Sequence, residues 1–215
     1  MEENNYEMIT KSSMEIILEQ MTNSVCLINN KKGSYELGFF VNFIYKKEKI
    51  KMLITRYDIM DGYNENILNI IFKNENKKIQ IGNKRYLNKE YNISIIEIIE
   101  NKNDNIKFLE IDDNLFNEEL EINYYKKSIY LIQYNNKKDI SVSFGMIKGI
   151  IKSKIIYSCF TNSNSKGLPI FNLSDKKIIG IHGHWLNDNN NKGKLFIKSF
   201  VKVISKDKRK LKKMR

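Results

Sequence analysis

Short runs of β-branched and aromatic residues, separated by clusters of Asn, Lys and Asp, recur along the whole chain of 215 residues. The chain has one proline and ten glycines, so these polar clusters take the place of the usual turn residues. Only residues 14–21 show helical spacing, with apolar side chains at Met14, Ile17, Leu18 and Met21, which predicts a short amphipathic arm. Many short strands and almost no other helix predict an all-β protein, a barrel or a sandwich, and periodicity does not choose between the two. The expected strands cover residues 24–28, 37–45, 50–54, 67–72, 78–81, 93–99, 129–134, 141–150, 155–159, 169–172, 177–182 and 194–197.

The composition is that of a folded globular protein. Hydrophobic residues make up 41% of the chain and charged residues 29%. No apolar run approaches the roughly 18 residues of a membrane-spanning helix. The first 21 residues are acidic and polar, where a secretory signal would be basic and then apolar. We therefore expect an intracellular, cytoplasmic protein with no transmembrane segment.

The two cysteines and two histidines give little sign of metal or redox chemistry. Cys26 and Cys159 lie far apart in strand-like apolar contexts, which favours two reduced core thiols over a disulfide. The chain has no CxxC and no HExxH motif. The sequence therefore predicts neither a metal site nor a cofactor.

The net charge of +12 is unevenly distributed. Lys, Asn and Ile are abundant everywhere, and all three have A- and T-rich codons, so a biased genome can produce much of the lysine excess. The segment 206–215 is different, because its seven basic residues and one aspartate supply half of the net charge. Such a run is most often a solvated, disordered end, and less often a contact with nucleic acid or an acidic membrane, or a localisation signal.

Four segments resemble, in the same order, the trypsin-like serine peptidase family, in its intracellular branch without a signal peptide. Residues 36–41, ELGFFV, look like the strand that usually reads GTGF. Residues 53–60, LITRYDIM, look like the strand and turn that carry the general-base histidine. Residues 90–98, EYNISIIEI, are similar to YDITIIEI, whose Asp orients that histidine. Residues 163–183, SNSKGLPIFNLSDKKIIGIHG, resemble the nucleophile loop GGSSGSPILN and the strand after it.

The resemblance implies a fold of two antiparallel six-stranded β-barrels, and it covers most of the chain between Ser24 and Val201. On this basis we expect one trypsin-like domain over residues 1–205, with the barrels at about 22–120 and 121–205. Residues 1–21 form the N-terminal arm, and residues 206–215 form the basic tail.

All three catalytic positions depart from the family. Residue by residue, the resemblance places Asp58 at the general base, Asn92 at the orienting aspartate and Lys166 at the nucleophilic serine. The family's mechanism needs an oxygen nucleophile whose proton is taken by an imidazole, which a buried carboxylate holds in place. Without these groups the acyl-enzyme cannot form by this route. The resemblance therefore implies a catalytically inactive homologue in which the three positions converge between the barrels and Asp58 pairs with Lys166.

The oxyanion hole also departs from the family pattern. The glycine two residues before the nucleophile, whose N–H would face the developing oxyanion, is Asn164 in this chain. Asn tolerates left-handed backbone angles, so the turn can survive. Gly167 and Pro169 keep their family positions, whereas Leu168 replaces a small residue, and a leucine there would crowd the cleft.

We expect a binding or regulatory module whose ligand is a peptide or protein held between the barrels. The expected binding residues are Asn164, Lys166, Gly167, His182 and Gly183. In the family, the strand that corresponds to the one carrying His182 and Gly183 lines the substrate pocket. The alternative is that these two residues are ordinary buried residues at the rim of the barrel. Two alternatives stay open: a nucleic-acid-binding protein that uses the basic tail, and a hydrolase with rewired catalytic residues.

Overall fold

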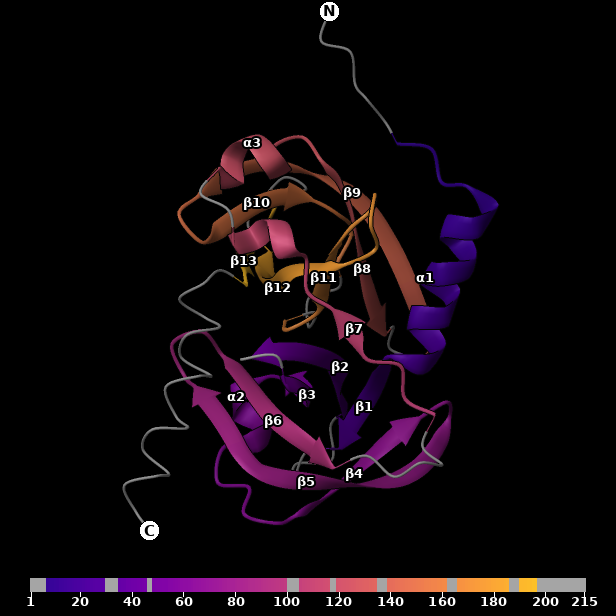
Figure 1. The fold of residues 1–215 in the computed structure, drawn as a ribbon, viewed down its shortest axis with the longest axis vertical. Helices are drawn as coiled ribbons and strands as arrows, with labels where there is room; N and C mark the ends of the chain where they lie inside the picture. The colour runs from indigo at the N-terminus through magenta and orange to yellow at the C-terminus, as the bar shows by residue number, and fades with distance from the viewer. Residues whose placement is uncertain are drawn as a thin grey trace, which may run out of the picture. The chain divides into compact units, whose positions relative to one another are not determined.

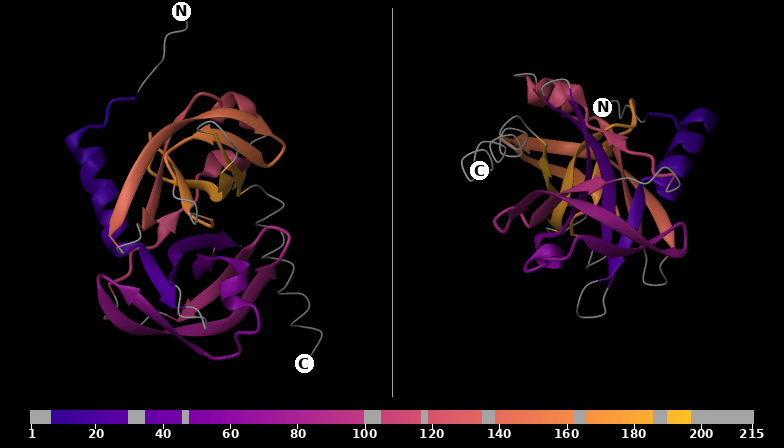
Figure 2. Two further views of the ribbon diagram at one scale, coloured as in Figure 1. Left: turned by 180° about the vertical axis from the view of Figure 1, so that it is seen from behind. Right: turned by 60° about the horizontal axis from the view of Figure 1, so that its bottom comes forward.

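A computed structural model describes residues 7–29, 35–45, 48–99, 105–116, 119–134, 139–161, 166–185 and 190–196. These residues form two compact units, each built around a β-barrel (Figures 1 and 2). The N-terminal barrel unit contains residues 22–111 and Phe196. The C-terminal barrel unit contains residues 7–21 and 112–195. The two barrels confirm the all-β class and the architecture that the family resemblance implied.

The N-terminal barrel is a ring of six antiparallel strands in the order β1-β4-β5-β6-β3-β2, closed by pairing of β1 with β2. A seventh, two-residue strand, β7, runs parallel to β2. A short helix, α2 (Tyr57–Met60), follows β3. The strands are β1 (Val25–Asn29), β2 (Tyr35–Tyr45), β3 (Glu48–Thr55), β4 (Ile67–Phe72), β5 (Glu75–Asn88), β6 (Ile93–Ile99) and β7 (Leu109–Glu110).

Alternation of side chains along each strand fills the interior of this barrel. In β4, Leu68, Ile70 and Phe72 are buried, and the residues between them face outward. The ring of Phe40 meets the rings of Phe72 and Phe108 edge-on, at centroid distances of 5.8 and 5.9 Å. Continuous apolar packing of this kind is what the alternating pattern in the sequence predicts.

The C-terminal barrel is a second closed ring, in the order β10-β13-β12-β11-β8-β9. Two short helical segments, η1 (Asp113–Phe116) and α3 (Leu120–Tyr124), precede its first strand. The strands are β8 (Ser128–Tyr134), β9 (Ile140–Ile151), β10 (Lys154–Ser158), β11 (Pro169–Asn172), β12 (Ile178–Trp185) and β13 (Asn191–Leu195).

The predicted helical arm is present as α1 (Lys11–Asn23). Of its apolar side chains, Ile17 is fully buried, whereas Leu18 is largely exposed. Gln20 anchors the helix instead, because its amide donates to the Lys176 carbonyl at 2.8 Å and accepts from the Tyr130 hydroxyl at 2.5 Å. Specific polar contacts therefore fix the arm, with less apolar burial than the spacing predicted.

Both cysteines are free and buried, which confirms the predicted core thiols. Burial raises the pKa of Cys159 to about 12 and raises that of Cys26 as well. Both side chains therefore stay protonated and behave as small apolar groups at neutral pH.

The two units meet in sequence between Ile111 and Asp112, nine residues before the expected boundary. Two backbone contacts explain this position. β7 pairs with β2 of the N-terminal barrel, and the N–H of Asp112 donates at 2.9 Å to the carbonyl of Ile178 in the C-terminal barrel. The predicted tail, residues 206–215, lies outside the described residues, and no helix within the described ranges is long and apolar enough to cross a membrane.

Candidate functional site

The position predicted for the general base, Asp58, lies on α2, directly after β3. Asp58 is half exposed, and Arg56 holds both of its carboxylate oxygens, with Nε to Oδ1 at 3.0 Å and Nη2 to Oδ2 at 2.5 Å. The same guanidinium donates through Nη1 to Glu36 Oε2 at 2.9 Å. Arg56 therefore bridges two carboxylates, one at the start of β2 and one on α2, in the bidentate geometry that suits its planar fork.

Glu36 is the more buried of the two acids, with 18% of its side chain exposed. Burial raises the pKa of Glu36, and the Arg56 guanidinium lowers it in part. The arginine that follows the LIT strand is thus a structural cation, and Asp58 is one of its two anchors. This pairing was missed at the sequence level, although the Arg-x-Asp spacing after a strand is a usable signal.

The position predicted for the orienting aspartate, Asn92, is at the same end of the N-terminal barrel. Thr55, the last residue of β3, pairs with Ser94 of β6, so the segments on either side lie close together. Asn92 sits just before β6 with φ of +49°, and its N–H donates to the Lys89 carbonyl at 3.2 Å. An asparagine adopts this left-handed conformation more readily than most residues, so the backbone conformation by itself accounts for an asparagine at position 92.

The position predicted for the nucleophile, Lys166, is in the loop before β11. Lys166 is exposed, and Gly167 after it is buried with φ of +81°, a conformation that favours glycine. The loop is joined to β12, because Gly167 N–H donates to the His182 carbonyl at 2.9 Å and His182 N–H donates to the Leu168 carbonyl at 2.8 Å. Leu168 is itself buried. Asn164 lies outside the described residues.

His182 is buried, with 3% of its surface exposed. Its Nδ1 shares a hydrogen bond of 2.5 Å with the hydroxyl of Tyr157 on β10. Burial raises the pKa of Tyr157 well above its ordinary value, so the phenol stays neutral. The histidine thus belongs to a buried polar pair within the barrel. Gly183 follows it at a register shift between β12 and β13.

Asn191 is a further buried polar residue that the sequence analysis did not single out. Its Nδ2 donates to the Cys159 carbonyl at 2.7 Å, and its Oδ1 accepts from the Thr161 hydroxyl at 3.0 Å. These bonds tie β13 to the segment that follows β10. A polar residue at an inward-facing strand position is the signal that could have identified it.

The structure thus brings together two separate sets of predicted residues. Asp58 and Asn92 lie at one end of the N-terminal barrel, and Lys166, Gly167, His182 and Gly183 lie around one loop of the C-terminal barrel unit. The convergence of the two sets, and an ion pair between Asp58 and Lys166, remain predictions. Each set is locally well defined by hydrogen bonds.

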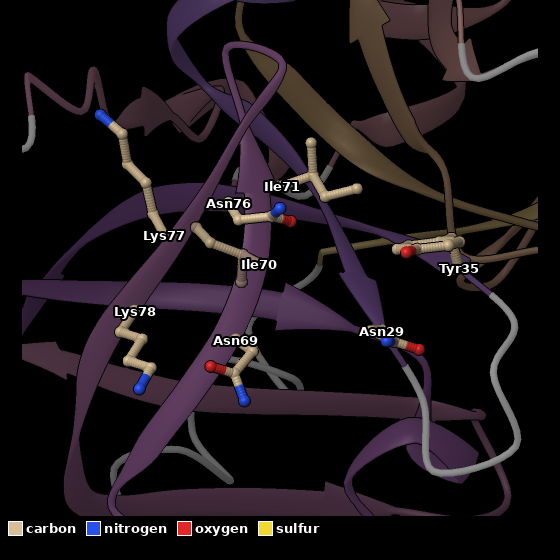
Figure 3. A pocket seen from close by; sticks show the side chains of 8 residues that line it. All are labelled: Asn29, Tyr35, Asn69, Ile70, Ile71, Asn76, Lys77 and Lys78. Carbon is tan, nitrogen blue, oxygen red and sulfur yellow. The ribbon is translucent and has the colours of Figure 1, made fainter.

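A pocket of about 330 Å³ lies on the N-terminal barrel (Figure 3). Its lining comes from β1, β2, β4 and β5, and β1 pairs with β4 at Leu27 with Ile71 and at Ile28 with Ile70. None of the predicted site residues lines it. Within the described ranges no group of three or more His, Cys, Asp or Glu side chains is arranged to hold a metal ion.

No protein-family model matches the sequence, and no curated protein is similar to it. Solved structures are similar in fold. A serine protease of a human pathogenic astrovirus is 14% identical with a TM-score of 0.57, over 82% of this chain and 91% of that chain. The Rv3671c protease, in an inactive form, is 9% identical with a TM-score of 0.63, over 87% of this chain and 89% of that chain. The chain therefore has the fold of the trypsin-like serine proteases.

Proposed function

We propose that the protein is a catalytically inactive member of this fold class that binds an extended peptide. The observation that carries the proposal is the state of the two positions where the chemistry would occur. Lys166 stands at the position predicted for the nucleophile, and Asp58, predicted at the general-base position, has both oxygens engaged by Arg56. Neither group is available for the proton transfer that acyl-enzyme formation requires.

Rewired chemistry is less well supported by the described residues. A lysine nucleophile is activated by desolvation in an apolar pocket, whereas Lys166 is exposed. Cys159 is a buried thiol whose pKa is raised to about 12, so it supplies no thiolate at neutral pH. His182, the histidine whose side chain the structure describes, has its Nδ1 hydrogen-bonded to the Tyr157 hydroxyl. Of these three described groups, Lys166 is solvated, Cys159 stays protonated and His182 Nδ1 is hydrogen-bonded, so none is activated for catalysis.

Peptide binding is supported by the backbone around β12. The ladder with β13 pairs His182 with Gly193 and His184 with Lys192, so Gly183 is the extra residue of a β-bulge. Its main-chain groups lie outside the regular pairing. An extended peptide can bind through main-chain hydrogen bonds at such a place, and this needs no catalytic triad. Lys166 and Gly167 lie in the loop that is bonded to the same strand.

The test combines cleavage and capture. Purified protein and its Lys166→Ala variant are incubated with a library of random decapeptides, and products are read by mass spectrometry. We expect no cleavage by either protein. Cleavage by the natural chain that the variant lacks would overturn the inactive assignment and make Lys166 part of an active site.

Capture then tests the binding role. A photo-crosslinking amino acid is placed at position 166, and as a matched control at position 89, an exposed lysine in the N-terminal barrel unit. We expect library peptides to crosslink from position 166 at least tenfold more than from position 89. Equal yields from the two positions in a folded sample would contradict peptide binding at this loop.

A further inference from the structure

Strand register gathers most of the lining of the pocket in Figure 3 on the outer face of the N-terminal barrel wall. The buried residues of β4 alternate with Asn69 and Ile71, which therefore point outward. Asn69 pairs with Lys78 of β5, and Ile71 pairs with Asn76. Directly paired residues of neighbouring antiparallel strands lie on the same face of the sheet. Two carboxamides and one ammonium group thus share the outer face with Ile71.

β1 and β2 extend this face on the other side of β4. Ile71 also pairs with Leu27 of β1, and Asn29 lies two residues further along β1, so its side chain lies on the same face. Asn29 in turn pairs with Tyr35 at the start of β2. Figure 3 shows Asn29 and Tyr35 on one side of the pocket and the two lysines on the other. Residues from four strands therefore line one recess.

The lining of the pocket is polar and contains no acid. Six of its eight residues are Asn, Lys or Tyr, and the other two are Ile. The three carboxamides and the Lys78 ammonium group make no hydrogen bond or ion pair with the described part of the chain. Lys77 differs, because its Nζ lies 3.6 Å from Glu75 Oε2. Lys78 is therefore the lysine of the pocket that is available to an anion.

Asn and Lys are abundant along the whole chain, so the number of these residues is not informative. Their common facing around one recess is informative, because register brings them together from separate strands. A cavity left by imperfect packing of a core is apolar and stays dry, whereas a polar recess holds water or a polar ligand. The pocket therefore has the character of a binding site for a polar molecule.

The lining indicates a hydroxylated, negatively charged ligand. A carboxamide presents donors and an acceptor side by side, so it can bond to two neighbouring hydroxyl groups of a sugar ring. The ring of Tyr35, with 37% of the residue exposed, offers an apolar surface to the C–H face of such a sugar. Lys78 supplies a point charge for a carboxylate at the edge of the sugar. A volume of about 330 Å³ lies at the lower end of the range for small-molecule sites, about 300–1,000 Å³, which suits a single sugar unit.

A nucleotide matches this lining less well. Phosphate groups are usually held by successive backbone N–H groups at a glycine-rich turn, or by several cations together. No glycine lines the pocket, and a phosphate dianion would meet one available ammonium group.

We propose that this pocket binds an acidic sugar, a pyranose unit that carries a carboxylate. Lys78 holds the carboxylate, Asn69 and Asn76 bond to hydroxyl groups of the ring, and Tyr35 packs against its C–H face. All eight lining residues belong to the N-terminal barrel unit. Sugar binding here does not depend on whether the protein binds peptides at the loop before β11.

The experiment titrates the isotope-labelled full chain with the methyl glycosides of glucuronic, galacturonic and N-acetylneuraminic acid, and follows the side-chain amide resonances by NMR. We expect at least one of these glycosides to shift the resonances of Asn69 and Asn76, with a Kd of about 1 mM. Its neutral counterpart, in which a CH2OH group replaces the carboxylate, should bind about fivefold more weakly, because it loses the charged contact with Lys78.

Two variants with matched controls locate the site. Lys78→Gln should weaken binding of the acidic glycoside by about fivefold and leave that of the neutral one unchanged. Its control, Lys89→Gln, changes an exposed lysine that does not line the pocket and should alter neither. Asn69→Ala should weaken both glycosides by about 2- to 10-fold, whereas Asn83→Ala, at an exposed position of β5 outside the pocket, should have no effect. The amide spectrum of each variant shows at the same time that it is folded.

Three outcomes would overturn the proposal. The first is that none of the three acidic glycosides shifts the resonances of Asn69 and Asn76 at about 20 mM. The second is equal binding of the acidic and neutral glycosides, or equal effects of Lys78→Gln and Lys89→Gln. The third is that uridine monophosphate shifts the same resonances at a lower concentration than any acidic glycoside, because the pocket would then be a nucleotide site.

Discussion

Replacing Arg56 by Gln should destabilise the protein more at neutral pH than at acid pH. Arg56 bridges Glu36 and Asp58 through contacts of 2.5 to 3.0 Å. A hydrogen bond to a charged group contributes about 1.5 kcal/mol or more when it is largely buried, as at Glu36. The contact with Asp58, whose side chain is 51% exposed, contributes about 0.5 kcal/mol because solvent screens it. We expect a loss of about 2 kcal/mol at pH 7, which lowers the melting temperature by about 4–8 °C.

The sign of the pH dependence follows from Glu36. Burial raises its pKa in the folded state above the ordinary 4.5, and Arg56 opposes that rise. For an acid with a raised folded pKa, the stability contribution is fully present below the unfolded pKa and falls as the pH rises through the folded value. Removing Arg56 raises the folded-state pKa of Glu36 further, so the variant loses more stability than the natural protein as the pH rises from acid to neutral. The loss caused by R56Q should therefore shrink to roughly half or less at pH 4.

The control is Arg85→Gln, measured in the same way by circular dichroism melting at pH 7 and pH 4. Arg85 donates to the carbonyls of Tyr63 and Glu65, both at 2.7 Å, and these acceptors do not titrate. Its loss should therefore be similar at the two pH values. If R56Q lost as much stability at pH 4 as at pH 7, or followed the profile of R85Q, the role of Arg56 as a bridge between two carboxylates would be refuted.

Two further substitutions test the packing of the C-terminal barrel. Gly145→Ala should lower the free energy of unfolding by about 3 kcal/mol, because the added Cβ would lie 1.4 Å from the Ser158 carbonyl oxygen on β10. The control is Gly149→Ala, where no described atom lies within 4 Å of the added Cβ, and it should change the free energy of unfolding by less than about 0.5 kcal/mol. Chemical denaturation would show whether the two variants differ. Tyr157→Phe should lower the free energy of unfolding by about 1–3 kcal/mol, because it removes the partner of the buried His182 Nδ1. The control is Tyr125→Phe at an exposed ring, which should change the free energy of unfolding by less than about 0.5 kcal/mol. Equal melting temperatures for these two variants would show that the Tyr157–His182 bond does not stabilise the barrel.

Local patterns in the sequence predicted much of this fold. Each expected strand overlaps an observed one, because alternation of buried and exposed residues is a property of a few neighbouring residues, although β5 extends well beyond the expected 78–81 and β13 begins three residues before the expected 194–197. The arm over residues 14–21 is helical for the same reason. The positions at Asp58, Asn92 and Lys166 came from the resemblance of short segments, and the structure places them after β3, before β6 and before β11. Their joint role as a former catalytic centre is still a prediction.

Contacts between distant segments were not predictable in the same way. The bridge from Glu36 through Arg56 to Asp58 requires β2 and α2 to meet, and the boundary at Asp112 depends on which barrel each backbone group bonds to. The shared face of Asn69 and Lys78 depends on strand register. A shift of one residue in register moves every side chain of a strand to the other face, and only the closed barrel selects the register. The sequence by itself thus determined the strands and their order, and the tertiary structure decided the partner of each charged and polar side chain, because partners are chosen by segments far apart in the chain.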